Sequence, residues 1–436
     1  MSAREELRVL HRAALDAAHA GRALERALGE REPGPGPFVL LACGKAACAM
    51  AESARRVLGP RIARGHVTTK DGHARPLPPL GVGEASHPLP DWRSELSARA
   101  ALALAESLGP REELLVLLSG GASALWCAPA PGLTLDDKRR TNELLLTSPA
   151  DIHELNAVRR HLSSVKGGGL VRAARGRPLH LLAVSDVRGD ALYDLGSGPA
   201  SADPTLFSEA RAVLRRHELW NAVPAPVRAR LERGVAGEIE ETLKPGDARL
   251  ASVSARIVAS LDGALDAAAA AARARGLRPR VLRDGLYGEV AAVARALAAE
   301  LRRAAASDCG LLLAAGEPTV RVRGSGRGGR AQELALRLAL ELGDELPFEA
   351  LCAGSDGSDG ATPAAGAFSD SSTRARAERL GLDLRGALAR SDSFPALEAL
   401  GDLYLTGPTE TNVGDLALVR LRPREAGEYD GRTGGQ

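Results

Sequence analysis

With 436 residues, the chain is too long for a single hydrophobic core, so we predict two domains. The 57 basic and 55 acidic residues leave a net charge of +2, which gives no indication of a surface made for nucleic acid. Five cysteines without a CxxC pair, a charged N-terminus and no long apolar run indicate a cytoplasmic protein without disulfides, signal peptide or membrane span.

Short aliphatic runs that alternate with long stretches rich in alanine, arginine and leucine predict an α/β fold. Five such runs read as buried strands: 36–43, 114–118, 179–184, 311–315 and 348–353. Continuous aliphatic strands between helices indicate parallel sheets covered on both faces. Polar loops follow these strands, and open α/β sheets bind ligands at that edge.

The first polar loop, ACGKAAC, follows the first predicted strand. Gly44 permits a close backbone approach, and Lys45 is expected to open a helix. Free N–H groups and the positive end of the dipole at a helix start favour phosphate or carboxylate. The loop lacks the GxxxxGK[ST] spacing of a Walker A motif. A solvated surface lysine is the alternative.

The second polar loop, SGGASAL, follows the strand at 114–118. It is a tight turn with hydroxyls and free amides that can bind an anion, supplied by Ser119, Gly120, Gly121 and Ser123. GxSxG is absent, which argues against a serine hydrolase.

A helix is predicted to begin at Ser148 and Pro149. Polar side chains then recur at a spacing that places them on one helix face: Asn156, Arg159, Ser163 and Lys166. The glycines Gly167–Gly169 end this helix, and Gly167 and Gly168 are candidate contacts to substrate or nucleotide. The face can hold a carboxylate or a phosphate chain, and a solvated helix face is the alternative.

The loop at 185–203 combines aspartates with glycines. Asp186 and Asp190 are the first candidates for holding Mg²⁺ through oxygen ligands, and Ser197 and Gly198 for contacts to substrate or nucleotide. An ordinary turn rich in aspartate is the alternative.

The segment 316–342 begins with GEPT, which carries Glu317 and Thr319. Its loop TVRVRGSGRGGR satisfies GxGxxG, a dinucleotide fingerprint when it follows a strand and opens a helix. Arg327 and Arg330 in the same loop suit a transferring phosphoryl group better. We read TVRVRG as a strand of alternating charge.

Residues 221–248 contain prolines, glycines and a charge run with weak periodicity, and a domain boundary is predicted near 235–250. The predicted domains are 1–240 and 241–420, followed by a tail at 421–436. Two polar loops close the second domain. Asp356 and Asp359 lie in GSDGSDG, where Asp356 is a further Mg²⁺ candidate, and Asn412 lies in TGPTETNVGDL.

Lysine is rare in this chain. Arginine supplies 52 of the 57 basic residues, and the five lysines stand at positions 45, 70, 138, 166 and 244. A lysine that is kept where arginine usually serves indicates a place that needs a compact ammonium group, such as one against a phosphate. Solvated surface lysines are the alternative.

In this order, the segments resemble the bacterial glycerate 2-kinase family over 7–418. The matching elements are GKAACAM, SGGASAL, LNAVRRHLSSVKGG, SDVRGD with GSGPASAD, GEPTVRVRGSGRGGRAQELAL, GSDGSDGATPAAGA and TGPTETNVGDL. The chain departs from the family pattern at Ala200, where threonine is expected, and at Ala315, where glycine is expected.

The resemblance implies a larger Rossmann-like N-terminal domain and a smaller α/β C-terminal domain, with a MOFRL-type signature from about residue 307 and the active site in the cleft between them. It implies a monomer or homodimer that uses ATP and Mg²⁺ to convert D-glycerate into 2-phosphoglycerate. Lys45 and Arg330 match the basic residues that such kinases use around the transferred phosphoryl group. Two alternatives remain, an NAD(P)H-dependent hydroxypyruvate reductase and a non-catalytic sensor of small acids.

Overall fold

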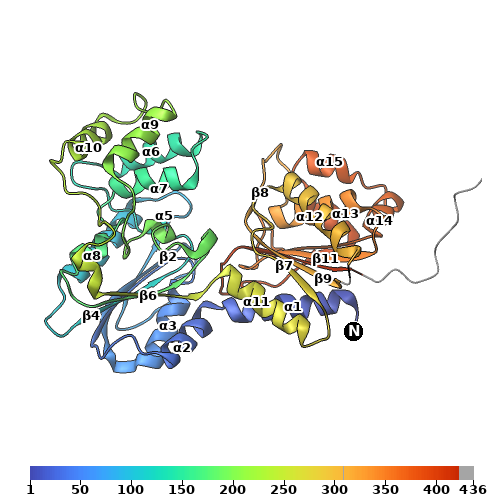
Figure 1. Cartoon of the computed structure of the whole chain (residues 1–436), viewed down its shortest axis with the longest axis horizontal. Coiled ribbons are helices and arrows are strands. Elements are labelled where there is room, and N and C mark those ends of the chain that lie inside the picture. The colour runs from blue at the N-terminus through green and yellow to red at the C-terminus, as the bar shows by residue number, and fades with distance from the viewer. Residues whose placement is uncertain (308, 422–436) are drawn as a thin grey trace, which may run out of the picture. The chain divides into compact units, whose positions relative to one another are not determined.

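The computed structural model describes residues 1–307 and 309–421 and divides into two compact units, each with its own sheet (Figure 1). One unit is His19–Ser260, and the other joins Met1–Ala18 to the C-terminal part from Leu261 onward. The predicted tail at 421–436 lies outside the described residues except for Leu421, which is the last residue of a strand. No helix among those described combines the length and apolar character needed to cross a membrane.

The unit His19–Ser260 is built on a six-stranded, fully parallel sheet of order β3-β2-β1-β4-β5-β6. Its strands are β1 (Phe38–Cys43), β2 (Ile62–Lys70), β3 (Gly81–Ala85), β4 (Glu113–Leu118), β5 (Leu179–Val184) and β6 (Val253–Ala259). This order places the topological switch point between β1 and β4, as in Rossmann-like folds. The predicted strands at 36–43, 114–118 and 179–184 and the Rossmann-like class are confirmed.

Helices cover both faces of this parallel sheet. One face carries α4 (Trp92–Glu106), α5 (Ala122–Leu125) and α8 (Gly169–Ala173), which share a core with alternate residues of β1, β4 and β5. The other face carries α2 (Ala20–Glu30) and α3 (Ala47–Leu58) (Figure 1). A separate helical cluster with its own apolar core comprises α6 (Leu135–Leu146), α7 (Ile152–His161), α9 (Phe207–Arg216) and α10 (Ala225–Val235).

The second unit contains a mixed sheet of order β13-β12-β11-β14-β9-β7, in which only β7 and β9 run parallel. Its strands are β7 (Pro279–Leu282), β9 (Leu311–Gly316), β11 (Phe348–Gly354), β12 (Gly366–Asp370), β13 (Leu403–Tyr404) and β14 (Asp415–Leu421). The predicted strands at 311–315 and 348–353 are confirmed, but the expected parallel arrangement is wrong here. Strands buried on both faces are aliphatic throughout in either direction, so composition does not reveal direction.

Helices also cover both faces of the mixed sheet. One face packs against α12 (Val290–Ala305), α13 (Arg330–Leu342), α14 (Thr373–Arg379), α15 (Leu384–Ala389) and α16 (Ser393–Leu400). The helices α1 (Ala3–Ala18) and α11 (Leu261–Arg273) lie side by side against the opposite face (Figure 1). A two-stranded pair, β8 (Gly288–Glu289) and β10 (Pro318–Thr319), completes the unit.

The division of the chain differs from the predicted boundary at 240/241 for two physical reasons. The strand β6 pairs with β5 and extends the N-terminal sheet to Ala259. The helix α1 packs on α11, and Arg4 forms ion pairs of 2.8 Å with Glu349, Asp370 and Asp402 of the C-terminal part. Strand pairing therefore assigns β6 to the first unit, and helix packing assigns α1 to the second. The linker-like composition, in contrast, lies at 221–248.

Candidate functional site

The loops that follow β1 and β4 meet at the switch point of the parallel sheet. The amide of Lys45 donates to the Gly120 carbonyl at 2.9 Å, and the amide of Ala46 donates to Ser119 Oγ at 3.1 Å. Gly44 has φ +133°, and a Cβ built on it would stand 2.1 Å from Ser119 Oγ, so the contact requires glycine. Lys45 lies two residues before α3, which begins at Ala47 and not at Lys45 as predicted.

A cavity of about 200 Å³ opens beside the SGGAS loop. The residues that line it are His87, Pro88, Pro90, Gly121, Ser123, Ala124, Cys127, Lys138, Asn142, Arg159 and Lys166. Three of them are cationic, Lys138, Arg159 and Lys166, and none is a carboxylate. We call this the cationic cavity. A cavity lined by several cations and no carboxylate favours the binding of a small anion.

Lys166 is buried, with 4% of its surface exposed. Its Nζ donates to the carbonyl oxygen of Ser123 at 2.8 Å and to Ser123 Oγ at 2.7 Å. Burial and the neighbouring charge of Lys138 lower the pKa of Lys166 well below its ordinary value. An anion that enters the cavity would therefore stabilise the charged form of Lys166.

Lys138 also lines the cavity and was not predicted as a site residue. It lies on α6 with 2% of its surface exposed, and its buried Nζ has no hydrogen-bond partner among the described residues. Burial lowers the pKa of Lys138, and the charges of Arg159 and Arg230 lower it further. An unpaired buried ammonium is costly, and an anion that enters the cavity would stabilise it.

Arg159, Asn142 and His87 complete the polar lining. Arg159 Nε donates to Asn142 Oδ1 at 3.1 Å, and burial lowers the pKa of Arg159. Burial and the charges of Lys45 and Lys70 lower the pKa of His87 to about 4, so its imidazole is neutral at pH 7. Lys70 therefore affects the electrostatics of the cavity, although it lies in none of the predicted motifs.

The predicted helix at 148–166 is shorter than expected. α7 begins after Asp151, whose side chain caps Glu154 N at 2.9 Å, and it ends at His161. Ser163 and Lys166 therefore lie beyond the helix, and the predicted shared face is wrong as a helix face. Lys166 and Arg159 nevertheless line the same cavity.

Asn156 is not among the lining residues and makes two hydrogen bonds. Its Nδ2 donates to Asp194 Oδ1 at 3.1 Å, and its Oδ1 accepts from Ser197 Oγ at 3.2 Å. Ser197 Oγ lies 3.0 Å from Ser123 Oγ, which links this pair to Lys166. The structure thus joins four predicted residues in one hydrogen-bonded chain.

Two predicted glycine-rich turns bind each other through the backbone. Gly167 N donates to Ser197 O at 3.1 Å, and Gly168 N donates to Gly198 O at 2.8 Å. A Cβ on Gly168, which has φ +81°, would stand 2.4 Å from Leu243 Cβ. Close packing and backbone hydrogen bonds therefore explain why glycine is needed at these positions. The turn that contains Gly167 and Gly168 directly follows Lys166.

The candidate metal carboxylates come from both units. Asp186 and Asp190 lie in the loop after β5, whereas Asp356 belongs to the other unit and accepts from Ser358 N at 3.0 Å. Among the described residues, no group of three or more His, Cys, Asp or Glu side chains can hold a metal ion. A Mg²⁺ ion held mainly by phosphates and water needs only one or two carboxylates, which Asp186 and Asp190 can supply.

In the C-terminal unit, Arg330 is the first residue of α13 and is held by two carboxylates. Its Nη1 lies 2.7 Å from Glu317 Oε1 and its Nε 2.6 Å from Asp415 Oδ2. Burial raises the pKa of Asp415 to about 7 even though Arg330 opposes the shift. Asp415 was not predicted as a site residue, although the TNVGDL motif contains it.

The remaining predicted residues of this unit make local contacts. Asp359 is 4% exposed and accepts from Ala331 N at 3.1 Å and Gln332 N at 2.8 Å, so it caps the first turn of α13. The guanidinium of Arg327 stacks 4.6 Å from the Phe394 ring centre. Thr319 is exposed, and Asn412 lies in the loop before β14.

The GxGxxG sequence lacks the surroundings of a dinucleotide site. The predicted strand TVRVRG is wrong, because only its first residue, Thr319, belongs to a strand, the two-residue β10. The strand that directly precedes the motif, β10, has two residues and pairs with β8 outside the six-stranded sheet. A dinucleotide fingerprint follows a strand of the main parallel sheet, so this motif does not support NAD binding.

Nearly the whole chain is similar to known proteins. The Domain of unknown function (DUF4147) family matches residues 6–232, and the MOFRL family matches residues 310–415. A protein named putative hydroxypyruvate reductase from Agrobacterium vitis is 39% identical over 428 residues, which is 97% of this chain and 95% of the relative. The glycerate 2-kinase of Pyrococcus horikoshii is 36% identical over 392 residues, or 88% of this chain and 87% of the relative.

The likeness extends to solved structures. The crystal structure of a glycerate kinase from Thermotoga maritima superimposes with a TM-score of 0.83 at 33% sequence identity, covering 95% of this chain and 100% of that chain. The family resemblance expected from the seven ordered motifs is thereby confirmed. The chain belongs to the glycerate kinase family, with a DUF4147 region followed by a MOFRL region.

Proposed function

We propose that this protein is an ATP-dependent glycerate kinase that phosphorylates D-glycerate at the C2 hydroxyl, giving 2-phosphoglycerate and ADP. The observation that carries the proposal is the cationic cavity, which joins three cations without a carboxylate and includes the SGGAS loop at the switch point. Its volume of about 200 Å³ suits a three-carbon acid. Membership in the glycerate kinase family supports the same reaction.

In this proposal, Lys138, Arg159 and Lys166 bind the glycerate carboxylate. Ser123 and Asn142 line the same cavity and can hydrogen-bond the substrate hydroxyls. A carboxylate that enters would pair with the Lys138 ammonium, which has no hydrogen-bond partner among the described residues, and would favour the charged form of Lys166. Fixing the carboxylate and the C3 hydroxyl leaves C2 as the reacting position, and polar sites of this kind discriminate steeply.

Lys45 and Arg330 are the proposed basic residues at the transferred phosphoryl group. The C2 hydroxyl oxygen attacks the γ-phosphorus of ATP, the bond to the bridging oxygen breaks, and ADP leaves, while the hydroxyl proton passes to an aspartate carboxylate or to water. Such transfer depends mostly on positioning and on neutralising charge, which fixed cations provide without reorganisation. The ion pairs of Arg330 with Glu317 and Asp415 hold its guanidinium in a defined orientation.

ATP and Mg²⁺ are the proposed cosubstrate and metal, with Asp186 and Asp190 as the first carboxylates for Mg²⁺ and Asp356 as the second choice. When bound, Mg²⁺ would neutralise phosphate charge. The contacts within the chain favour a positioning role for six predicted residues: Asn156, Gly167, Gly168, Ser197, Gly198 and Asp359. Direct contacts to substrate or nucleotide are proposed for the others: Gly44, Ser119, Gly120, Gly121, Ser123, Arg159, Lys166, Glu317, Thr319, Arg327 and Asn412.

We also propose a cytoplasmic enzyme, since its five cysteines are all free thiols, as a reducing compartment favours. The sensor alternative is disfavoured by the relatives, since the similar proteins of Pyrococcus horikoshii and Thermotoga maritima are named as glycerate kinases. The reductase alternative is disfavoured by the surroundings of GxGxxG.

One assay tests the reaction against both alternatives. Purified protein with ATP, Mg²⁺ and D-glycerate should release ADP, and protein with NADH and hydroxypyruvate should leave NADH unoxidised. Oxidation of NADH without ADP release would establish a reductase. No turnover in either assay, together with measurable binding of glycerate, would establish a sensor.

A coupled assay tests the position of phosphorylation. Enolase converts 2-phosphoglycerate directly into phosphoenolpyruvate, which is followed by ultraviolet absorbance. We expect a signal with enolase alone. A signal that requires added phosphoglycerate mutase would place the phosphate on C3.

A further inference from the structure

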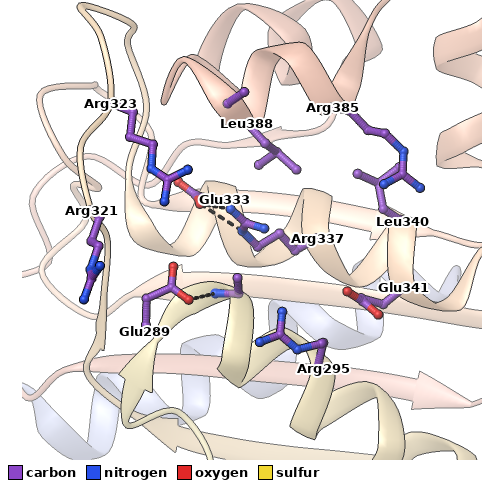
Figure 2. A pocket seen from close by; sticks show the side chains of 12 residues that line it. Glu289, Arg295, Arg321, Arg323, Glu333, Arg337, Leu340, Glu341, Arg385 and Leu388 are labelled. Atoms are coloured by element: carbon purple, nitrogen blue, oxygen red, sulfur yellow. Dashed lines mark hydrogen bonds and ion pairs between the residues drawn. The ribbon is translucent and has the colours of Figure 1, made fainter.

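A second concavity lies wholly within the C-terminal unit, bordered by α12, α13, α15 and the segment that follows β10 (Figure 2). It encloses about 600 Å³, which is within the range of sites for small molecules. None of its lining residues belongs to the predicted site, and neither Lys45 nor Arg330 lines it. We call it the arginine pocket.

Five arginines and three glutamates line the arginine pocket, and two of the glutamates are already engaged. Glu333 accepts from Arg337 Nε at 2.9 Å and Nη2 at 2.7 Å (Figure 2). Glu289 accepts from the amides of Ala291 at 3.1 Å and Ala292 at 3.3 Å, which caps α12. These contacts leave Glu341 as the only lining carboxylate outside an ion pair or a cap.

The other four guanidinium groups have no hydrogen bond or ion pair with any residue that the structure describes: Arg295, Arg321, Arg323 and Arg385. They come from three separate segments, α12, the stretch after β10 and α15. Figure 2 shows Arg321 and Arg323 at one end of the pocket and Arg295 and Arg385 further along it. Four uncompensated guanidinium groups around one concavity attract an anion with several charges, and their planar forks match phosphate oxygens.

The pocket also has an apolar part. Leu340 and Leu388 face it from α13 and α15 (Figure 2). Inorganic phosphate would use neither the leucines nor the full volume. A ligand that matches both parts carries adjacent phosphate groups on an organic body.

We propose that the arginine pocket binds an organic polyphosphate of nucleotide size. The proposal stands on the residues of one unit and requires no phosphoryl transfer. Two sources share this chemistry, the nucleotide that the kinase consumes and a separate nucleotide that acts as an effector.

Titration calorimetry of ATP into the full chain without glycerate tests the proposal. Two double variants remove the cations in separate pairs, Arg321→Ala with Arg323→Ala, and Arg295→Ala with Arg385→Ala. Each lost pair of charge-assisted contacts should weaken binding at least about 10-fold. Arg379→Ala is the matched control, since Arg379 is an exposed arginine of the same unit that does not line the pocket.

Wild-type affinity in both double variants would overturn the proposal. An effect confined to the Arg321 and Arg323 pair would also overturn it, because it would indicate a contact of that segment alone. Where both pairs weaken binding, the KM for ATP identifies the source. A KM that rises with Kd assigns the pocket to the consumed nucleotide, and an unchanged KM assigns it to an effector. Since calorimetry needs no turnover, failure of the proposed kinase reaction leaves this test intact.

Discussion

The cationic cavity and the arginine pocket both collect positive charge, but they do so with different chemistry. The cavity is small, and its cations are buried, with Lys138 and Lys166 at 2% and 4% exposure. The pocket is larger, and its unpaired cations are exposed arginines. Burial lowers the pKa of both cavity lysines, whereas a guanidinium in contact with water remains charged.

The two sites therefore differ in how much they lower the stability of the fold. A buried ammonium without a partner lowers the stability of the fold and is kept only where a ligand repays the loss. An exposed guanidinium costs the fold little and can therefore be kept for a weaker or occasional ligand. The cavity should consequently act at every turnover, and the arginine pocket should depend more on conditions.

The largest effects are expected from removing one basic residue in each unit. Lys45→Ala and Arg330→Ala should each lower kcat about 100-fold or more, since each removes charge at the transferred phosphoryl group. Only Arg330→Ala should also lower the unfolding free energy, by about 1–3 kcal/mol, because it removes the ion pair of the buried Asp415. Steady-state kinetics and chemical denaturation measure the two quantities.

Lys244→Ala and Arg379→Ala are the controls for these two variants. Lys70 is unsuitable as a control, because its charge lowers the pKa of His87 in the cavity wall. Near-normal kcat in both site variants, with unchanged circular dichroism, would remove Lys45 and Arg330 from the mechanism.

Lys138→Met should change stability and affinity in opposite directions. Replacing an unpaired buried ammonium by an apolar side chain should raise the unfolding free energy by on the order of 1 kcal/mol. Loss of a contact to the substrate carboxylate should raise the KM for D-glycerate about 10-fold. Arg140→Met on the exposed side of the same helix is the matched control and should alter neither quantity. A Lys138→Met protein that is less stable and binds glycerate normally would show that the lysine is structural.

The sequence predicted the strands and their polar loops well because both depend on local composition. It could not predict which strands run antiparallel. It also could not predict that α1 belongs to the C-terminal unit and β6 to the N-terminal unit. Contacts with partners far along the chain decide both features. The Lys45 and SGGAS loops were predicted as site elements because each directly follows a strand that is buried throughout.

Lys138 and Asn142 were missed because they lie within a helix that carries no recognisable motif. The scarcity of lysine was the available indication. Two of the five lysines line the cavity, and a third, Lys45, packs against the neighbouring loop. Glycine motifs were less informative, since Gly167 and Gly168 pack against their own chain.

Added salt should lower the affinity of the arginine pocket for ATP a few-fold more than the affinity of the cationic cavity for glycerate. Raising the ionic strength from about 0.1 to 1 M shortens the screening length from about 10 to about 3 Å. Exposed charges are screened more than buried ones, so ATP binding at the arginine pocket should weaken several times more than glycerate binding in the cavity. Calorimetric titrations in increasing NaCl measure both slopes. Equal slopes would mean that the two sites do not differ in exposure to solvent.

The smallest expected effect is the uptake of a fraction of a proton when D-glycerate binds. In the free protein, burial and Lys138 lower the pKa of Lys166, so part of the population is neutral above that lowered pKa. A bound carboxylate favours the ammonium form and raises the pKa again. Binding must then take up protons, and by linkage the affinity for glycerate must fall as the pH rises. The arginine pocket should take up none, because guanidinium groups remain protonated throughout this range.

Calorimetry at one alkaline pH in two buffers of different ionisation enthalpy measures this uptake directly. The apparent binding enthalpy of D-glycerate should differ between the buffers, and Lys166→Met should reduce the difference. ATP, whose phosphates are fully ionised at that pH, should give the same enthalpy in both buffers. Identical enthalpies for glycerate would mean that the cavity lysines are already fully charged. The contrast between a titrating buried site and a permanently charged exposed one would then not hold.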